Sequence, residues 1–118
     1  MTLVDTSVWV DHLRRRNERL AVLLDDAQVL CHPFVVGELA CGNLKNRRAI
    51  LRYLAALPAV SQAEHAEVLH LVESHLLYGR GLGWVDVHLL ASCLINACDL
   101  WTFDKPLRAA AIGLGIAF

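Results

Sequence analysis

The chain has 118 residues, of which 56% are hydrophobic and 19% are charged, and its formal net charge is -1. That length suits one domain with its own core, so we expect a single domain over residues 1–118. The nearly balanced charge gives by itself no sign of a nucleic-acid ligand. The apolar share exceeds the usual value of about 45–50%, which predicts that some apolar surface faces a partner.

Cysteine spacing and hydropathy indicate the cellular compartment that we expect for this protein. The chain has 4 cysteines but no CxxC pair, and Asp5 interrupts the N-terminus before a signal peptide could form. We therefore expect reduced, buried thiols in a cytoplasmic protein. The apolar stretch from Leu89 to Leu100 is broken by polar residues and falls short of the roughly 18 apolar residues that a membrane span needs. Membrane insertion is not expected.

The first half of the chain alternates strands and helices. Residues 2–4 have strand character, Asp5 follows them directly, and Thr6 and Ser7 then open a helix. The elements expected next are a helix at 18–27, a strand at 28–31, a helix that begins at Pro33 and stops near Gly42, a basic amphipathic helix at 46–57 and a weak strand at 58–60.

The second half continues the same alternation. Ser61 and Glu64 form a capping box that opens a helix running to about residue 77, and a glycine-rich loop at 78–84 follows. The remaining elements are a helix to about 98 with Asp86 near its start, a strand at 100–103 that ends at Asp104, a helix at 105–114 and a short strand at 116–118. This order predicts an α/β fold, with a parallel sheet covered by helices on both faces.

Four acidic residues lie in apolar or structured surroundings, where a charge is costly: Asp5, Glu38, Asp86 and Asp104. Parallel strands end at one edge of a sheet, so the two aspartates that follow strands can converge there, with the other two carboxylates presented by helices. Like charges packed together need a cation between them, and Mg²⁺ or Mn²⁺ suits a carboxylate set. Such a site suits the hydrolysis of phosphodiesters. The simpler alternative is that Asp5 or Asp104 only caps the helix behind it.

Two further groups of residues support a phosphodiester site. The hydroxyls of Thr6, Ser7 and Thr102 are placed to orient the carboxylates or their waters. Most of the basic residues fall in two windows, which predict contacts with RNA phosphates or, alternatively, solvated helix faces. The candidate RNA-binding residues are Arg14, Arg15, Arg16, Lys45, Arg47 and Arg48.

Four segments resemble the successive motifs of PIN-domain ribonucleases, specifically the VapC-type toxins of bacterial toxin–antitoxin pairs. They are residues 4–9, 37–42, 81–91 and 100–105, and their order spans nearly the whole chain. The resemblance implies a three-layer α/β/α sandwich whose central parallel sheet has the strand order 3-2-1-4-5. It also implies Mg²⁺- or Mn²⁺-dependent endonucleolytic cleavage of RNA, homodimerisation, and inhibition by a VapB-type antitoxin.

By motif position, the resemblance assigns the metal-binding and catalytic quartet to Asp5, Glu38, Asp86 and Asp104. Two rival functions remain. A catalytically inactive PIN module would bind RNA or protein without cutting, but it should have lost at least one member of the quartet, and all are present. A free-standing PIN nuclease in RNA maturation would need no antitoxin.

The first helix carries apolar side chains over roughly 200° of arc, more than packing on one sheet requires. We therefore expect part of it to form a groove with the next helix, where an amphipathic antitoxin segment would bind. The residues predicted to line this groove are Trp9, Leu13, Leu20 and Leu24. The alternative for Trp9 is a place in the core.

Overall fold

The structure is a computed structural model that describes residues 1–118. Its strands are β1 (Thr2–Val4), β2 (Val29–Leu30) and β3 (Asp99–Trp101). Its helices are α1 (Thr6–Arg15), α2 (Glu18–Asp25), α3 (Pro33–Cys41), α4 (Arg47–Ala56), α5 (His65–Ser74), α6 (Trp84–Asn96) and α7 (Lys105–Gly113). No helix is both long and apolar enough to cross a membrane.

The central sheet is parallel, with the strand order β2-β1-β3. Leu3 lies opposite Leu30 on one side and Leu100 on the other. Two predicted outer strands are reduced to single parallel bridges, Cys31 with Ala59 and Leu100 with Ala117. These bridges lie at the two outer edges of the sheet, as the order 3-2-1-4-5 requires. The predicted order is therefore confirmed, but only three of the five segments form regular strands. Pro58 contributes to the shortening at one edge, because it has no N–H to donate to a ladder.

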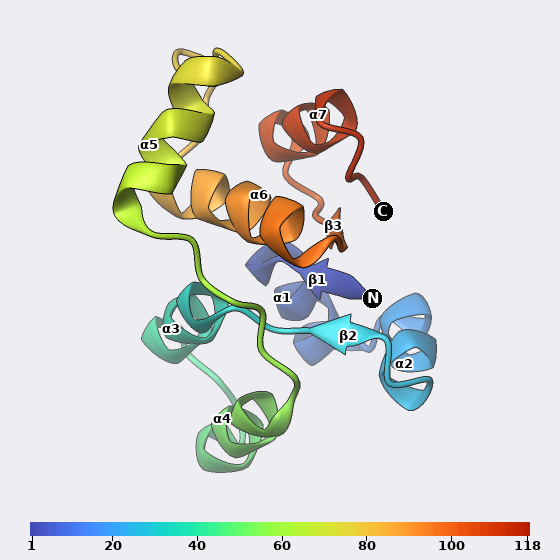
Figure 1. Ribbon diagram of the computed structural model, residues 1–118. Helices are drawn as coiled ribbons and strands as arrows, with labels where there is room; N and C mark the ends of the chain where they lie inside the picture. Colours follow the sequence, from blue (N-terminus) through green and yellow to red (C-terminus); the bar gives the residue numbers. More distant parts are fainter.

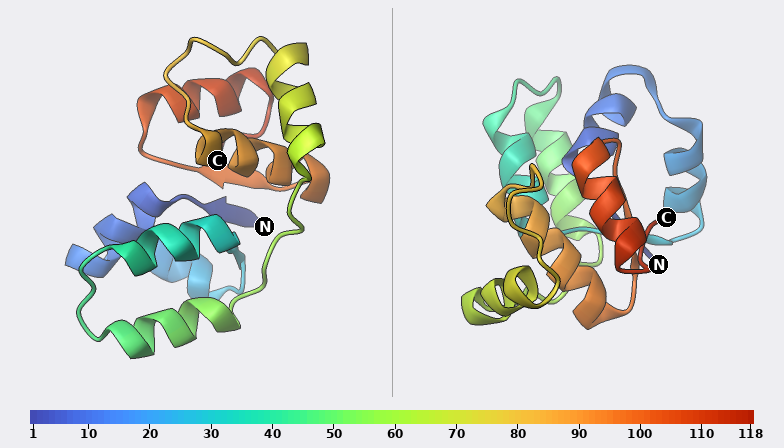
Figure 2. Two further views of the ribbon diagram at one scale, coloured as in Figure 1. Left: turned by 90° about the vertical axis from the view of Figure 1, so that its left-hand side faces the viewer. Right: turned by 90° about the horizontal axis from the view of Figure 1, so that it is seen from above.

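Helices cover both faces of the sheet (Figure 1). The helices α1 to α4 lie on one side, and α5, α6 and α7 lie on the other, as the left view of Figure 2 shows. The predicted α/β/α sandwich is therefore confirmed. The sheet itself is buried between these layers: Leu3, Val4 and Leu100 are all in the core. Parallel strands buried on both faces are expected to be continuously apolar, which explains why β1 shows no alternation.

Helix α5 begins later than predicted, because its cap is Glu64 rather than Ser61. The backbone N–H of Glu64 donates to Oε1 of Glu67 at 2.9 Å, which is half of a capping box shifted by one turn. Ser61 is used elsewhere. Its N–H donates to the side-chain oxygen of Asn96, and its carbonyl accepts from the Asn96 amide, so the segment before α5 is tied to the end of α6.

Candidate active site

Asp5 stands where β1 ends and α1 begins, and it is 7% exposed. Its backbone occupies the N-cap position of α1, yet its side chain caps nothing. One carboxylate oxygen, Oδ2, instead accepts hydrogen bonds from Ser7 Oγ and from Thr102 Oγ1, each at 2.7 Å. The other oxygen, Oδ1, receives no hydrogen bond from the protein. Asp5 is therefore a fixed carboxylate with one oxygen left for a ligand.

The end of β3 is connected to the end of β1 through the same two hydroxyls. The backbone N–H of Phe103 donates to Ser7 Oγ, and that of Asp104 donates to Thr102 Oγ1, both at 3.0 Å. These contacts exist because β1 and β3 are paired neighbours in the sheet. Asp104 is exposed, and its Oδ2 accepts from the N–H of Leu107 at 3.1 Å, which caps α7. The side chain of Asp104 therefore caps the helix behind it, and that of Asp5 does not.

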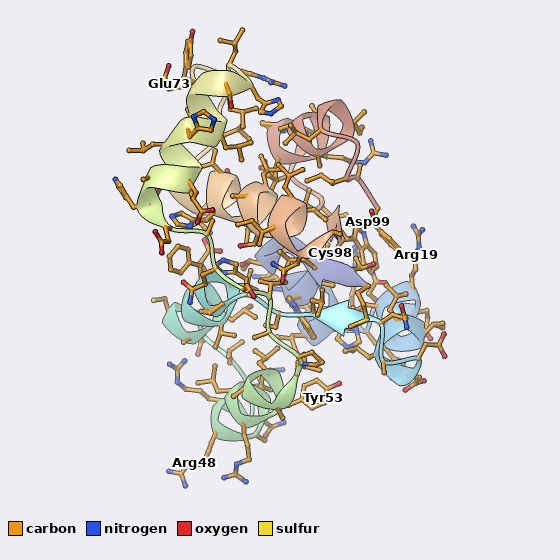
Figure 3. All side chains as sticks on the ribbon, in the orientation of Figure 1. Arg19, Arg48, Tyr53, Glu73, Cys98 and Asp99 are labelled. Carbon is orange, nitrogen blue, oxygen red and sulfur yellow. The ribbon has the colours of Figure 1, made fainter.

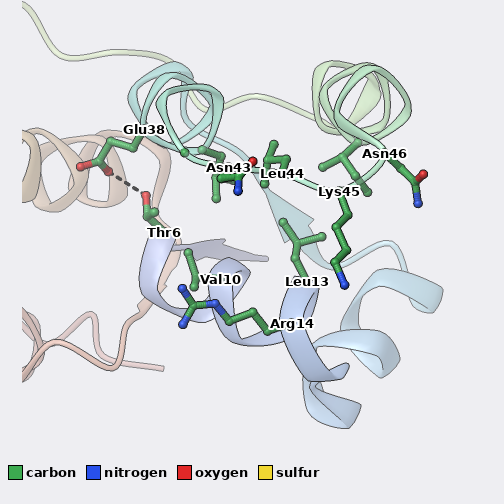
Figure 4. A pocket seen from close by; sticks show the side chains of 12 residues that line it. Thr6, Val10, Leu13, Arg14, Glu38, Asn43, Leu44, Lys45 and Asn46 are labelled. Carbon is green, nitrogen blue, oxygen red and sulfur yellow. Dashed lines mark hydrogen bonds between the residues drawn. The ribbon is translucent and has the colours of Figure 1, made fainter.

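Glu38 reaches the site from α3. It is exposed, and its Oε1 accepts a hydrogen bond from Thr6 Oγ1 at 2.7 Å. Figure 4 shows this pair, with α3 on one side and the first turn of α1 on the other. Thr6 is therefore placed to orient Glu38, while Ser7 and Thr102 are placed to orient Asp5.

Asp86 lies in the first turn of α6, where its Oδ2 accepts from the backbone N–H of Gly83 at 2.8 Å. Burial raises the pKa of this carboxyl, and the charges of Asp104, Asp5 and Glu38 raise it further, while the bond from Gly83 partly offsets them. Each of the other three predicted carboxylates therefore lies near enough to Asp86 for its charge to raise that pKa. We call these four residues and their surroundings the carboxylate site.

The carboxylate site suits a hard divalent cation by the chemistry of its donors. It offers only carboxylate oxygens, and their mutual repulsion, seen in the raised pKa of Asp86, would be relieved by positive charge. No group of three or more acidic, histidine or cysteine side chains stands close enough to hold an ion by itself. That spacing is compatible with Mg²⁺, which keeps several waters and binds directly to only one or two carboxylates.

A cavity of about 540 Å³ opens beside the pair formed by Thr6 and Glu38. Its walls come from α1, α3, α4 and the segment between α3 and α4, and Figure 4 shows the side chains of Arg14 and Lys45 among those that line it. The apolar lining consists of Val10, Leu13, Leu39, Leu44 and Ile50. Both polar and apolar ligand segments could be accommodated there.

The predicted basic residues divide into two groups. Arg14 and Lys45 line the cavity next to Glu38. Arg15 pairs with Asp11 at 2.5 Å and Arg16 with Glu18 at 3.0 Å. Arg47 donates to the carbonyls of Ala40 and Gly42, and Arg48 is exposed on α4 and points away from the molecule (Figure 3). Of the six, only Arg14 and Lys45 line the cavity that Glu38 also lines.

The structure corrects the predicted groove between the first two helices. Trp9 is 1% exposed and Leu20 is 0% exposed, so both belong to the core and neither can anchor a partner. The broad apolar arc of α1 is divided instead: Trp9 faces the core, and Leu13 faces the cavity, because α3 packs beside α1. Leu24 is half-buried and packs against the core from α2. The open apolar wall therefore lies between α1 and the α3–α4 segment.

Comparison with known families matches the PIN domain over residues 2–113. The chain belongs to the PIN-domain family. Two curated relatives, from two strains of Mycobacterium tuberculosis, are both named Ribonuclease VapC32. Each is 49% identical over 118 residues, which cover 99% of this chain and 95% of the relative. The resemblance to VapC-type PIN proteins is thereby confirmed.

Sequence reasoning missed a run of aromatic and imidazole rings that joins the helices of this PIN domain. Neighbouring centroids lie 4.9 Å apart between His32 and Phe34, 4.8 Å between Phe34 and His88, and 4.7 Å between His88 and Trp84. His65 on α5 adds a ring 5.0 Å from Trp84. The spacing of Trp84 and His88, four residues apart on one helix, was the available signal.

His32 anchors one end of this run. Its Nδ1 accepts from the N–H of Phe34 at 2.9 Å and so caps α3. A neutral imidazole that accepts at Nδ1 carries its proton on Nε2, and that atom is buried without a partner. Burial, with a smaller effect from His88, lowers the pKa of His32 to about 4, so the ring is neutral at physiological pH. The run therefore connects α3 to α6 through tilted and edge-on rings, with a neutral imidazole at the His32 end.

Proposed function

We propose that this chain, as a single PIN domain over residues 1–118, is a metal-dependent endoribonuclease. We further propose that it acts in the cytoplasm as the toxin of a VapBC-type pair. The observation that carries the proposal is the carboxylate site. Asp5 is fixed there by two hydroxyl donors, and the charges of Asp5, Glu38 and Asp104 help to raise the pKa of Asp86. The name of the curated relatives, Ribonuclease VapC32, supports the same activity. The intact quartet disfavours an inactive PIN module.

Mg²⁺ or Mn²⁺ would be held by Asp5, Glu38, Asp86 and Asp104, by one or two of them directly and by the others through its waters, and when bound it would supply a hydroxide near neutral pH and offset charge on the phosphate. The residues of the chain contribute orientation. Ser7 and Thr102 hold Asp5 through one oxygen, and Thr6 holds Glu38 through one oxygen. The N–H of Gly83 does the same for Asp86. Each donor leaves the opposite carboxylate oxygen free for the metal or its waters.

RNA binding near this site is assigned to Arg14 and Lys45, which bring positive charge to the cavity lining. The double variant Arg14→Ala/Lys45→Ala should flatten the salt dependence of single-stranded RNA binding by about 0.7 log units for each phosphate that is no longer bound. The matched control is Arg48→Ala/Arg52→Ala, which removes the same charge from the exposed face of α4. Equal slopes in the two double variants would assign Arg14 and Lys45 to solvated helix faces.

The proposed VapB-type antitoxin would lay an amphipathic segment in the cavity, against Leu13 and Ile50, and so cover Glu38. The free-standing nuclease would have no such partner. The proposed homodimer has a candidate surface on the other side of the sheet, where α5 and α6 expose the apolar residues Leu69, Leu94 and Ile95. A short upstream reading frame for a DNA-binding antitoxin would favour the toxin over the maturation nuclease.

The deciding experiment uses purified protein that has been stripped with a chelator. We expect single-stranded RNA to be cleaved after addition of Mg²⁺ or Mn²⁺, to stay intact with chelator, and to be protected when the candidate antitoxin is added. Sequencing the new 5′ ends would identify the RNA that is cut. An RNA that stays intact at saturating Mn²⁺ would refute the nuclease, and unaltered cleavage in the presence of a bound antitoxin would refute the toxin.

A further inference from the structure

Two large aromatic side chains are exposed beside members of the carboxylate site. Trp84, two residues before Asp86, is 41% exposed, and Phe103, directly before Asp104, is 50% exposed. The other two tryptophans, Trp9 and Trp101, are buried. Single exposed apolar residues are common on protein surfaces, so exposure alone decides nothing. These two rings are distinguished by their places next to Asp86 and Asp104 and by the contacts that hold them.

Phe103 is held close to Asp5 by its backbone. Its N–H donates to Ser7 Oγ at 3.0 Å, and the same hydroxyl donates to Asp5 Oδ2 at 2.7 Å. Its neighbour Thr102 donates to that oxygen as well. The main chain at Phe103 is thus two hydrogen bonds away from the buried carboxylate, while the side chain is open to solvent.

Trp84 is held by rings from two helices. It makes an edge contact with His88 on its own helix, at 4.7 Å and an interplanar angle of 83°. His65 on α5 lies 5.0 Å away on a tilted plane. His88 in turn contacts Phe34 on α3, the helix that carries Glu38. These contacts restrict the orientation of the indole without covering it, so the exposed surface is preorganised.

The two rings belong to the same edge of the molecule. The glycine-rich loop before Trp84 touches the start of α7, because a Cβ on Gly81 would lie 3.5 Å from Pro106 Cγ. Pro106 follows Asp104 by two residues, and Phe103 precedes Asp104 by one. The left view of Figure 2 shows the loop before α6 passing beside α7. Trp84 and Phe103 therefore stand at the two chain segments that meet beside Asp86 and Asp104.

We propose that Trp84 and Phe103 are stacking surfaces for nucleobases of a single-stranded RNA, next to the phosphodiester that the carboxylate site receives. The proposal rests on the proposed nuclease function. In a duplex the faces of the bases are covered by neighbouring bases, so stacking on protein rings selects loops, bulges and unpaired strands. Every base has such a face, so these rings would restrict the substrate to unpaired RNA without fixing its sequence.

The surroundings of the rings favour RNA over a protein partner. A protein interface typically has an apolar centre from which charged residues are depleted. Here the rings alternate with carboxylates along the chain, Trp84 with Asp86 and Phe103 with Asp104. Single-stranded RNA has the same alternation, because its apolar base faces can stack on the rings while its phosphates, with a cation, lie at the carboxylates.

The test uses intrinsic tryptophan fluorescence, since Trp84 is the exposed tryptophan and the other two are buried. The parent protein is titrated with a short single-stranded RNA, and separately with an abasic oligomer of equal length and charge, with Ca²⁺ in place of Mg²⁺. We expect quenching by the RNA and little by the abasic oligomer.

Trp84→Ala and Phe103→Ala should each bind RNA roughly ten- to hundredfold more weakly, and Trp84→Phe should stay close to the parent. Tyr53→Ala is the matched control, because Tyr53 is similarly exposed on α4 (Figure 3).

Each outcome separates this proposal from the nuclease function. If the parent cleaves RNA but both alanine variants bind and cleave like it, the stacking proposal is wrong and the nuclease stands. Equal quenching by RNA and abasic oligomer in the parent would also overturn it, and that measurement needs no variant to fold. If Trp84→Ala changes the oligomeric state and leaves RNA affinity unchanged, the ring belongs to a protein contact instead. Absence of cleavage in the parent would refute the nuclease, while the titration would still decide the stacking.

Discussion

The ends of β1 and β3 look alike in sequence and differ in structure. Each strand leads to an aspartate at the N-cap position of the next helix: Asp5 directly follows β1, and Asp104 follows β3 after Thr102 and Phe103. Asp104 performs that capping role and is exposed. Asp5 does not cap, is buried, and is held by Ser7 and Thr102 instead. At the same helix position, the side chain of Asp104 therefore stabilises the helix start, whereas that of Asp5 is held by hydroxyls and leaves the helix start uncapped.

The difference arises from what surrounds each carboxylate. Ser7 follows Asp5 by two residues and Thr102 directly follows the neighbouring strand β3, so two hydroxyls converge on one oxygen. Asp104 has Pro106 at the corresponding position, which offers no side-chain donor, and the N–H of Leu107 takes its oxygen. Asp5 is thus the more firmly oriented of the two, which is the property that a metal ligand needs.

The largest expected effect separates the two aspartates directly. Asp5→Asn should lower RNA cleavage by roughly 10²–10³-fold, because losing a charged ligand removes several kcal/mol of charge stabilisation and each 1.4 kcal/mol is tenfold in rate. Asp104→Asn, which keeps a capping oxygen, should lower it by about tenfold. Single-turnover cleavage at saturating Mn²⁺ measures both. Equal losses would mean that the two strand ends serve the metal alike.

A smaller effect is expected from the hydroxyls that distinguish the two ends. Ser7→Ala and Thr102→Val should each raise the Mn²⁺ concentration needed for half-maximal cleavage by about 10–100-fold, since groups that orient metal ligands typically contribute that much. Thr102→Val keeps the shape of the side chain, so folding should be preserved. Thr6→Val serves as the comparison, because its hydroxyl holds Glu38 instead. If only Thr6→Val shifts the metal titration, Glu38 rather than Asp5 is the decisive ligand.

The fold class and the carboxylate quartet could be predicted from sequence because each depends on local patterns. Alternating helices and strands specify a parallel sheet, and parallel strands deliver their ends to one edge. The division of labour between Asp5 and Asp104 could not be predicted, since it depends on a hydroxyl 97 residues away in the chain. Periodicity also gave the width of the apolar arc on α1, but not that Trp9 points to the core and Leu13 to the cavity.

Cysteine placement shows a similar limit. Helix α6 stops at Asn96, and Ala97 takes a left-handed conformation with φ 50°. The N–H of Cys98 then donates back to the carbonyl of Cys93 at 3.1 Å, and both thiols are buried as expected. Cys41 was expected to be buried and is exposed at the end of α3. The error at Cys41 comes from a helix end, which local patterns locate less well than a helix interior.

The third prediction concerns the charge that Asp86 bears among the other carboxylates. Its folded-state pKa is raised, so the folded protein holds this proton more tightly than the unfolded chain does. The contribution of Asp86 to stability therefore falls as pH rises from its ordinary value of 3.8 through the raised pKa. In chelator, Asp86→Asn should be more stable than the parent at pH 7, and this advantage should shrink toward pH 4. Denaturant unfolding at both pH values measures it.

His32 changes the stability of the protein in the opposite direction. Because its imidazole is buried and neutral, its contribution to stability is lost as pH falls from 6.5 toward the lowered pKa of about 4. Comparing the parent with Asp86→Asn at each pH cancels that contribution, since both proteins retain His32. Mn²⁺ should stabilise the parent at pH 7 and affect Asp86→Asn less. If the difference in unfolding free energy between the two proteins stays constant across this pH range, the ionised form of Asp86 is not disfavoured in the folded protein.

The smallest expected effect tests the capping role that Asp104 has and Asp5 lacks. Asp104→Ala should lower the free energy of unfolding by about 1 kcal/mol, because the N–H of Leu107 loses its acceptor. Asp104→Asn should change it by only a few tenths of that, since asparagine caps equally well. Asp5→Asn removes no cap and relieves repulsion among the carboxylates, so the metal-free protein should be as stable as the parent or more so. Thermal and denaturant unfolding of the three variants in chelator provide the measurement. If Asp5→Asn is destabilised as much as Asp104→Ala, the hydroxyls that hold Asp5 contribute mainly to folding, and the contrast between the two strand ends does not reflect function.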